Sequence, residues 1–443
     1  MPHDTGFFET TAENSQPLSE RAPTQKQSIP DFAFDNAKWR ESCKSNAAIP
    51  AGYTYLAQLM GHDLGHTLAA NAVPWTAHHA DENLPNARYN LVENPLTLET
   101  IYGKGPVGAH GLYNAHNCLF RLDKNATLAQ SVSYHPDELA EPLLADKRNR
   151  ATLMLHKMAV VWMQYHNTIA RDIMASEGFN EKSHAEHGYF VDVFTRARQK
   201  VLRSWHAVVM QDILPTIAHP DAMALDEVEL EKTFLLGDIP VLNGVLRAFH
   251  ALPLKHYRLS ASGEFPFRQL QEGEVGELRN WRIDWSQFFG TTARNKTGFS
   301  ASYSALFTML SGRSIMEADL KSAIIALPYD RLHADVLKAH DTLPKSLKRD
   351  VSSAELERLF NLKAAECGVQ GVSKGAFTEI PLFLMLMLEA QFYGETGGLG
   401  PFGSVLLRRF LAHKINSIST GDTGSLTPVH TSMTEIINAL EKT

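Results

Sequence analysis

Long stretches of helical periodicity constrain the fold of this chain more than any other feature of its sequence. Between residues 150 and 174, apolar side chains recur three or four positions apart, which is the spacing of one face of an amphipathic helix. A second such stretch runs from about 189 to 214, and Pro215 is expected to end it because proline lacks a backbone N–H. Few segments alternate apolar and polar residues as half-buried strands do. The sequence therefore predicts a mainly α-helical fold with little β structure.

The domain organisation follows from where this apolar pattern begins. Residues 1–48 are polar and lack a sustained apolar period, so we expect an N-terminal arm that lies over a folded body. Residues 49–443 show no break in composition and no internal repeat. The chain is 44% hydrophobic and 21% charged, which is enough apolar material for one large core. We predict a single helical domain over 49–443.

Charge and hydropathy exclude several classes of partner. The chain has 42 Lys and Arg against 49 Asp and Glu, so it lacks the basic excess that binds nucleic acid. Its longest apolar stretch, near residues 380–390, is shorter than the roughly 20 residues that span a bilayer. The first residues do not form a basic and then apolar signal. We expect a cytoplasmic protein with no membrane span and no nucleic-acid partner.

The segment 55–66 concentrates residues that could perform chemistry. His62 and His66 would share a face if one helix carried both, which suggests zinc, but the Glu of the His-Glu-x-x-His zinc motif is missing. The pair His62 and Asp63 locally resembles the metal-binding pair of HD-type metal phosphohydrolases. That family has a further ligand histidine upstream, and here the only upstream histidine is His3 in the polar arm. The hydrolase interpretation stays open but lacks its first ligand.

Four short segments between residues 50 and 415 have to be considered together. They are Gln58 to Asp63, Asp146 to Asn149 with His166-Asn167 eighteen residues after Arg148, Arg247 to His250, and C-terminal stretches within 278–289 and 381–401. Their order and spacing resemble those of the animal-type haem peroxidases, the peroxidase–cyclooxygenase superfamily, and of its bacterial members in particular. The resemblance implies a large helical haem-peroxidase domain.

The resemblance also implies a role for each matched residue. Gln58 and His62 would face the open side of the haem, Arg148 would be the distal cation, and His250 would be the proximal iron ligand. Reduction of hydrogen peroxide needs a base that moves a proton and a cation where negative charge develops, and histidine and arginine supply these groups. Arg247 matches the family's arginine that binds a haem propionate.

We therefore expect a haem peroxidase that uses hydrogen peroxide to oxidise a small organic substrate. The alternatives are a haem-dependent oxygenase for a fatty acid or other small molecule, and a haem-binding protein that has lost turnover. The cyclooxygenase branch has a tyrosine where this chain has Arg247, which favours a peroxidase. Gly61 and Ala151 replace the two carboxylates that bond covalently to haem in mammalian members, so we expect non-covalent haem b.

The resemblance extends to a calcium site but departs from the family there. The loop 94–103 resembles the family's calcium loop, yet Thr97 stands where an Asp is expected. Asp63 and Glu99, together with backbone carbonyls, are the oxygen ligands that remain. Calcium binding is left open, and the sequence does not predict the oligomeric state or the identity of the organic substrate.

Overall fold

The computed structural model describes most of the helical body of the chain. The described residues are 33–34, 47–69, 88–122, 143–180, 185–261, 263–271, 281–299, 342–343, 369–370, 382–393, 397–419 and 427–442. Within them, none of the helices has both the length and the apolar character needed to cross a bilayer.

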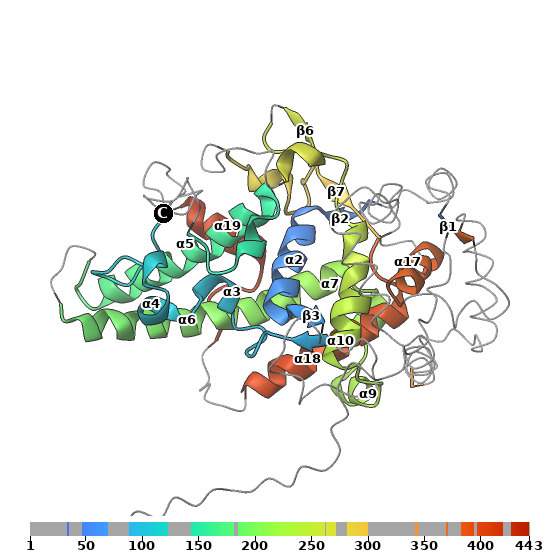
Figure 1. Ribbon diagram of the computed structural model, residues 1–443, viewed down its shortest axis with the longest axis horizontal. Helices are drawn as coiled ribbons and strands as arrows, with labels where there is room; N and C mark the ends of the chain where they lie inside the picture. Colours follow the sequence, from blue (N-terminus) through green and yellow to red (C-terminus); the bar gives the residue numbers. More distant parts are fainter. Residues whose placement is uncertain are drawn as a thin grey trace, which may run out of the picture.

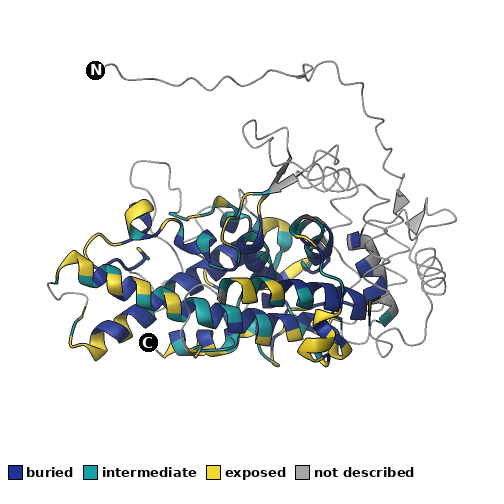
Figure 2. Ribbon diagram, turned by 90° about the horizontal axis from the view of Figure 1, so that it is seen from below, coloured by how far each residue is buried: buried dark blue, intermediate teal, exposed yellow. Residues whose placement is uncertain are grey.

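Helices dominate the described structure, which confirms the predicted fold class. The longer helices are α2 (Gly52–Leu64), α5 (Leu153–Ser176), α6 (His187–Val208), α17 (Leu382–Tyr393), α18 (Pro401–Ser419) and α19 (Met433–Glu441). Figure 1 shows α2 at the middle of the molecule, with α5 and α6 extending side by side away from it. In Figure 2 the buried residues lie mainly along the facing sides of the helices and the exposed residues along their outer sides. The helices therefore enclose a shared apolar core.

The helix α5 is the centre of this core. Its start is set by Thr152, whose side chain accepts a hydrogen bond from the Leu155 N–H at 3.2 Å. The helix thus begins at Leu153 and not at residue 150, because Lys147–Arg150 form a separate 3₁₀ turn, η5. The side chain of Asn167 clamps the backbone of Phe120, accepting from its N–H at 2.8 Å and donating to its carbonyl at 3.0 Å. Asn167 therefore fixes the position of α5 against the segment that contains Phe120.

The expectation that Pro215 ends the second helix is wrong. A π-helical turn, η6 (Val209–Ile213), follows α6 and leads directly into α7 (Leu214–Ile217), which contains Pro215. The wider π turn, in which the Leu214 N–H bonds to the Val209 carbonyl, accommodates a residue that has no N–H of its own. The helical path therefore continues for one more turn.

The π turn also joins two distant helices through Asp212. The Asp212 carboxylate accepts from the Tyr53 hydroxyl at 2.6 Å and from the Met433 N–H at 2.7 Å. Tyr53 lies in the first turn of α2 and Met433 begins α19. One carboxylate thus fixes the start of α2 against the C-terminal helix.

Strands are short and occur only as antiparallel pairs in the described residues. The pairs are β1 (Ala33–Phe34) with β8 (Val369–Gln370), β2 (Ile49–Pro50) with β7 (Lys296–Thr297), β3 (Thr67–Ala69) with β4 (Arg88–Asn90), and β5 (His256–Arg258) with β6 (Glu264–Pro266). The first pair connects the predicted arm to the body, and most of residues 1–48 lie outside the described residues. The division at residue 48 stays a prediction.

We predict that Gly52→Ala destabilises the fold while Gly61→Ala, in the same helix, does not. A Cβ at residue 52 would clash with the Phe289 ring and lie 2.8 Å from the Phe288 carbonyl oxygen, whereas a Cβ at residue 61 would lie 3.8 Å from its nearest neighbour. Overpacking of this kind costs about 1–3 kcal/mol, and alanine is favoured over glycine inside a helix by up to about 1 kcal/mol. Thermal unfolding of the two variants should therefore diverge, and equal midpoints would contradict the packing described.

Candidate functional site

The helix α2 positions Gln58 and His62 one turn apart on one side of the helix, both half-buried. The helix then ends at Leu64, and Gly65 is extended, with φ −167° and ψ 153°. His66 lies beyond this end and is exposed, so it does not share the helical face of His62. The zinc interpretation, which required that shared face, is wrong.

The carbonyls at the end of α2 accept hydrogen bonds from Gly65, which directly follows the helix, and from two other segments. The last carbonyls of a helix have no partner within the helix and require one elsewhere. Here the acceptors and donors are Gly61 O with Gly65 N at 3.0 Å, His62 O with Arg148 Nη2 at 3.0 Å, Asp63 O with Leu96 N at 3.3 Å, and Leu64 O with Asn90 Nδ2 at 3.0 Å. The backbone that carries His62 is therefore fixed from several directions.

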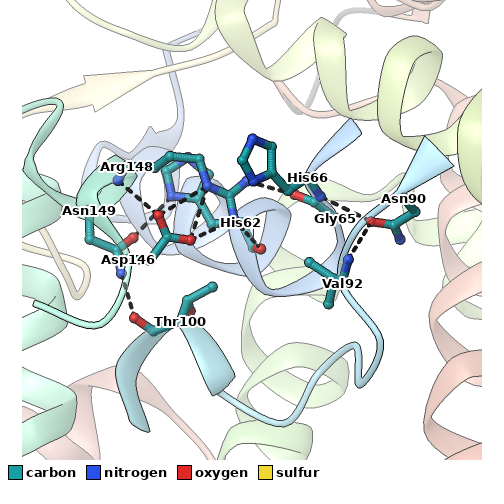
Figure 3. Close-up of polar contacts among 9 residues, drawn as sticks. All are labelled: His62, Gly65, His66, Asn90, Val92, Thr100, Asp146, Arg148 and Asn149. Carbon is teal, nitrogen blue, oxygen red and sulfur yellow. Dashed lines mark hydrogen bonds and ion pairs between the residues drawn. The ribbon is translucent and has the colours of Figure 1, made fainter. Parts of the chain in front are cut away.

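Arg148 lies directly at this helix end (Figure 3). Its guanidinium donates to the carbonyls of His62 and of Gly65, the latter at 2.8 Å, and forms an ion pair with Asp146 at 2.6 Å. A cation is favoured at the C-terminus of a helix because the backbone dipoles place partial negative charge there. Arg148 is thus held in a fixed orientation beside His62, and its role as a distal cation stays a prediction.

The neighbour of Arg148, Asn149, determines which nitrogen of His62 carries the proton. Asn149 is fully buried, and its Nδ2 donates to the Thr100 carbonyl at 3.1 Å. This bond turns its Oδ1 toward His62 Nδ1, 3.0 Å away (Figure 3). Because an amide oxygen can only accept, His62 Nδ1 must donate, and the neutral ring then has a lone pair on Nε2. His62 is held as a proton acceptor.

The electrostatics keep this base uncharged. Burial, and next the positive charge of Arg148, lower the pKa of His62 to about 4. Burial alone would raise the pKa of Asp146, but its hydrogen bonds to Arg148 outweigh this and hold the pKa below its ordinary value. At neutral pH the site therefore contains a neutral imidazole next to an ion pair.

Asp63 and Glu99, the two predicted calcium ligands, already bond to groups of the protein. Asp63 is fully buried, and its Oδ2 accepts from the Leu98 N–H at 2.9 Å and from the indole N–H of Trp205 at 3.0 Å. Its Oδ1 is buried and has no hydrogen-bond partner among the described residues, so calcium binding stays a prediction. The Glu99 carboxylate is paired with Lys104. Among the described residues no cluster of three or more His, Cys, Asp or Glu side chains is arranged to bind a metal.

The predicted proximal residues lie on an element that packs against α2. Arg247 and His250 belong to the 3₁₀ helix η8 (Leu246–Ala251), which contacts α2. Gly61 faces Leu246 of this helix, since a Cβ there would lie 3.8 Å from Leu246 Cδ1. The side chains of Arg247 and His250 lie outside the described part of the structure. The structure thus brings the two segments together, and the roles of the two side chains stay predictions.

Two residues that the sequence analysis did not assign to the site are Asp146 and Asn149. Both belong to the segment that carried the family resemblance, but neither was given a function. Asp146 fixes the Arg148 guanidinium and Asn149 fixes the His62 tautomer. The sequence marked these two residues only by their position beside Arg148. The role of Asn149 depends on His62 and Thr100, which lie far away in the sequence.

Comparison with known proteins finds similarity to solved structures but none to family models or curated sequences. No family model matches the chain, and no curated protein does. Peroxidase A from Dictyostelium discoideum is 11% identical, with a TM-score of 0.48 over 94% of this chain and 90% of that one. The fatty acid alpha-dioxygenase of Oryza sativa is 10% identical, with a TM-score of 0.49 over 91% of this chain and 77% of that one.

We predict that His62 is a neutral imidazole with its proton on Nδ1 until the pH falls to about 4. Because this pKa lies below the value of about 6.5 for an unfolded histidine, the unfolded chain binds the proton more readily between these two pH values. His62 therefore contributes stability above about pH 6.5 that is lost as the pH falls toward 4. NMR titration with ring-¹⁵N-labelled histidine would measure both the tautomer and the pKa.

Two variants of Asn149 test the tautomer assigned to His62, because they should shift the pKa of His62 in opposite directions. Asn149→Leu removes the acceptor, so the pKa of His62 should fall further and the tautomer should become mixed. Asn149→Asp keeps an acceptor and adds negative charge, so the pKa should rise with the proton still on Nδ1. A parent protein with its proton on Nε2 would contradict the tautomer assignment.

Proposed function

We propose that this protein is a haem-dependent peroxidase that reduces hydrogen peroxide and oxidises a small organic molecule. One observation carries the proposal: a neutral histidine with a free Nε2 lone pair is held beside an arginine whose orientation is fixed. A base and a permanent cation side by side are what peroxide cleavage requires of a protein.

In this proposal His62 moves the proton. Its Nε2 accepts a proton from one peroxide oxygen and returns it to the other oxygen as that oxygen leaves as water. The ring can do so without reorienting, because the Nδ1–H remains bonded to Asn149 throughout. The low pKa of His62 keeps the acceptor form available at neutral pH.

Arg148 stabilises the negative charge that develops on the departing oxygen. Of the five N–H donors of its guanidinium, four are used by Asp146, His62 and Gly65. One Nη1–H is left that no described residue accepts. An arginine fixed by four bonds can direct its fifth with little reorganisation.

The haem would be held by residues of η8. His250 would ligate the iron, and Arg247 would bind a propionate by a charge-assisted bond. Haem supplies the iron at which the oxygen–oxygen bond is reduced. Gly61 and Ala151 have no side-chain oxygen, so the group would be a non-covalent haem b.

The other interpretations receive less support from the described contacts. Arg247 still stands where the cyclooxygenase branch has its tyrosine, which places an oxygenase second. The carboxylate of Asp63 binds two N–H donors in the interior, so it does not serve the metal pair of a phosphohydrolase. A haem-binding protein without turnover would not require the fixed tautomer of His62.

We expect His62→Ala to retain haem but to react with hydrogen peroxide about 100- to 10,000-fold more slowly, the usual contribution of a general acid–base group. His66→Ala is the matched control, because His66 is an exposed histidine four residues away. Stopped-flow absorption of the haem-loaded variants would give both rates. If the two variants reacted at the same rate, His62 would not be the base.

We expect His250→Ala to lose most of its haem or to bind it with a changed spectrum, because an axial imidazole anchors the iron and sets its electron density. His256→Ala, at an exposed position of strand β5, should keep the parent spectrum. The haem of the parent protein should pass into acidified organic solvent, since it is not covalently attached. A parent spectrum in His250→Ala would assign the iron ligand to another residue.

A further inference from the structure

A row of aromatic rings runs from the neighbour of His62 to the surface of the protein. The ring centroids of Trp205 and Trp162 are 5.0 Å apart, those of Trp162 and Tyr165 are 6.0 Å apart, and those of Tyr165 and His430 are 5.5 Å apart. The first three rings are buried, while His430 is half-buried and follows the exposed Val429. Rings in contact over such short steps form a path along which an electron can move.

The inner end of this row is attached to the candidate site. The indole N–H of Trp205 donates to the carboxylate of Asp63 at 3.0 Å, and Asp63 directly follows His62 in α2. A carboxylate hydrogen-bonded to an indole stabilises the positive charge that the ring would carry after losing an electron. Trp205 is therefore placed to be oxidised from the site.

The outer end provides an acceptor for a proton. Ser204 Oγ accepts from the N–H groups of Val429 and His430 at 3.2 and 3.3 Å, which uses both of its lone pairs. Its own hydrogen must then go to the Tyr165 oxygen, 3.0 Å away. The Tyr165 hydroxyl consequently donates to His430 Nδ1 at 2.9 Å. His430 lies two residues before Ser432, whose capping box with Glu435 starts α19.

Trp162, between the two ends, has no such acceptor. Its indole N–H is buried and has no hydrogen-bond partner in the described structure. An oxidised Trp162 could not lose its proton and would remain a cation until an electron reached it. Tyr165, the neighbouring ring, can supply this electron because its proton can pass to His430. The oxidised species then remains on Tyr165 as a neutral radical.

We propose that Trp205 and Trp162 carry one-electron oxidation outward and that Tyr165 is a redox-active tyrosine whose proton moves to His430. This inference rests on the proposed function, which names hydrogen peroxide as the oxidant. Reduction of one peroxide to two waters takes two electrons and two protons, and two molecules of a hydrogen-atom donor such as a phenol supply them. One of the electrons first leaves Tyr165 through the two tryptophans while the Tyr165 proton moves to His430, which gives a neutral tyrosyl radical. One donor molecule then reduces this radical, which takes its proton back from His430 while the donor releases its own proton to water. The second donor molecule supplies the other electron and proton at the candidate site.

The first experiment uses freeze-quenched electron paramagnetic resonance of the haem-loaded protein mixed with hydrogen peroxide. The parent should show a tyrosyl radical, and Tyr165→Phe and Trp162→Phe should lose it. Tyr102→Phe is the matched control, because Tyr102 is also buried and bonded to a histidine, His166 at 3.1 Å, but has no tryptophan among its described ring contacts. Loss of the radical in the control but not in Tyr165→Phe would overturn the inference.

A second experiment needs no peroxide and separates the two proposals. A laser flash that photoionises tryptophan should produce a tryptophan radical that decays as a tyrosyl radical forms. Tyr165→Phe should abolish this transfer, and His430→Gln should slow it about 100-fold, the cost of a lost proton acceptor. Transfer after the flash but no reaction with peroxide in stopped-flow absorption would leave the pathway standing and refute the proposed function. Absence of transfer in the parent, or its persistence in Tyr165→Phe, would refute the pathway.

Discussion

The structure around the candidate site depends on one constraint: the last carbonyls of a buried helix need hydrogen-bond donors from outside the helix. Water cannot satisfy all of them, because α2 lies in the middle of the molecule (Figure 1). Donors from η5 and from the segment that contains Asn90 and Leu96 bind there instead. The same bonds that complete the helix fix the position of His62 and bring Arg148 beside it. The hydrogen bonds that complete the helix are therefore the ones that also assemble the candidate site.

The same helix end also carries Asp63, whose buried carboxyl group needs hydrogen-bond donors. Burial raises the pKa of this carboxyl group to about 7, and the N–H donors of Leu98 and Trp205 offset part of that cost. Leu96 and Leu98 adopt left-handed backbone conformations, with φ of 59° and 53°. Such conformations are costly for residues other than glycine, at about 1–2 kcal/mol each. Here the N–H of each residue bonds to Asp63, so the helix end holds this loop in its strained form.

Local patterns in the sequence predicted those features that depend on neighbouring residues. The apolar period over residues 150–174 predicted α5, and the family resemblance implied that Gln58 and His62 face the same way, as they do in α2. Features that depend on distant atoms were missed. The role of Asn149 requires the carbonyl of Thr100, and the termination of α2 before His66 requires the side chain of Asn90. No local period encodes such contacts.

Pro215 is a second case in which a local sequence rule failed because of contacts with distant residues. The rule that proline ends a helix assumes α-helical geometry in the preceding turn. The π turn at Val209–Ile213 removes that assumption, and Asp212 within the turn is held by Tyr53 and Met433. The exception therefore comes from tertiary contacts of the turn, which the sequence around the proline does not reveal.

Three buried or half-buried histidines show why geometry, more than the pKa alone, identifies the candidate base. Burial is the largest cause of a lowered pKa in all three, to about 4 for His62 and about 3 for His156 and His166. All are therefore neutral at pH 7. His156 and His166 are fully buried, and neither ring nitrogen of His156 has a partner among the described residues. His62 alone of the three is half-buried, has its tautomer fixed by an amide oxygen, and stands beside an ion-paired arginine. A low pKa makes each ring a base in principle, but only at His62 do fixed tautomer, partial exposure and adjacent cation coincide.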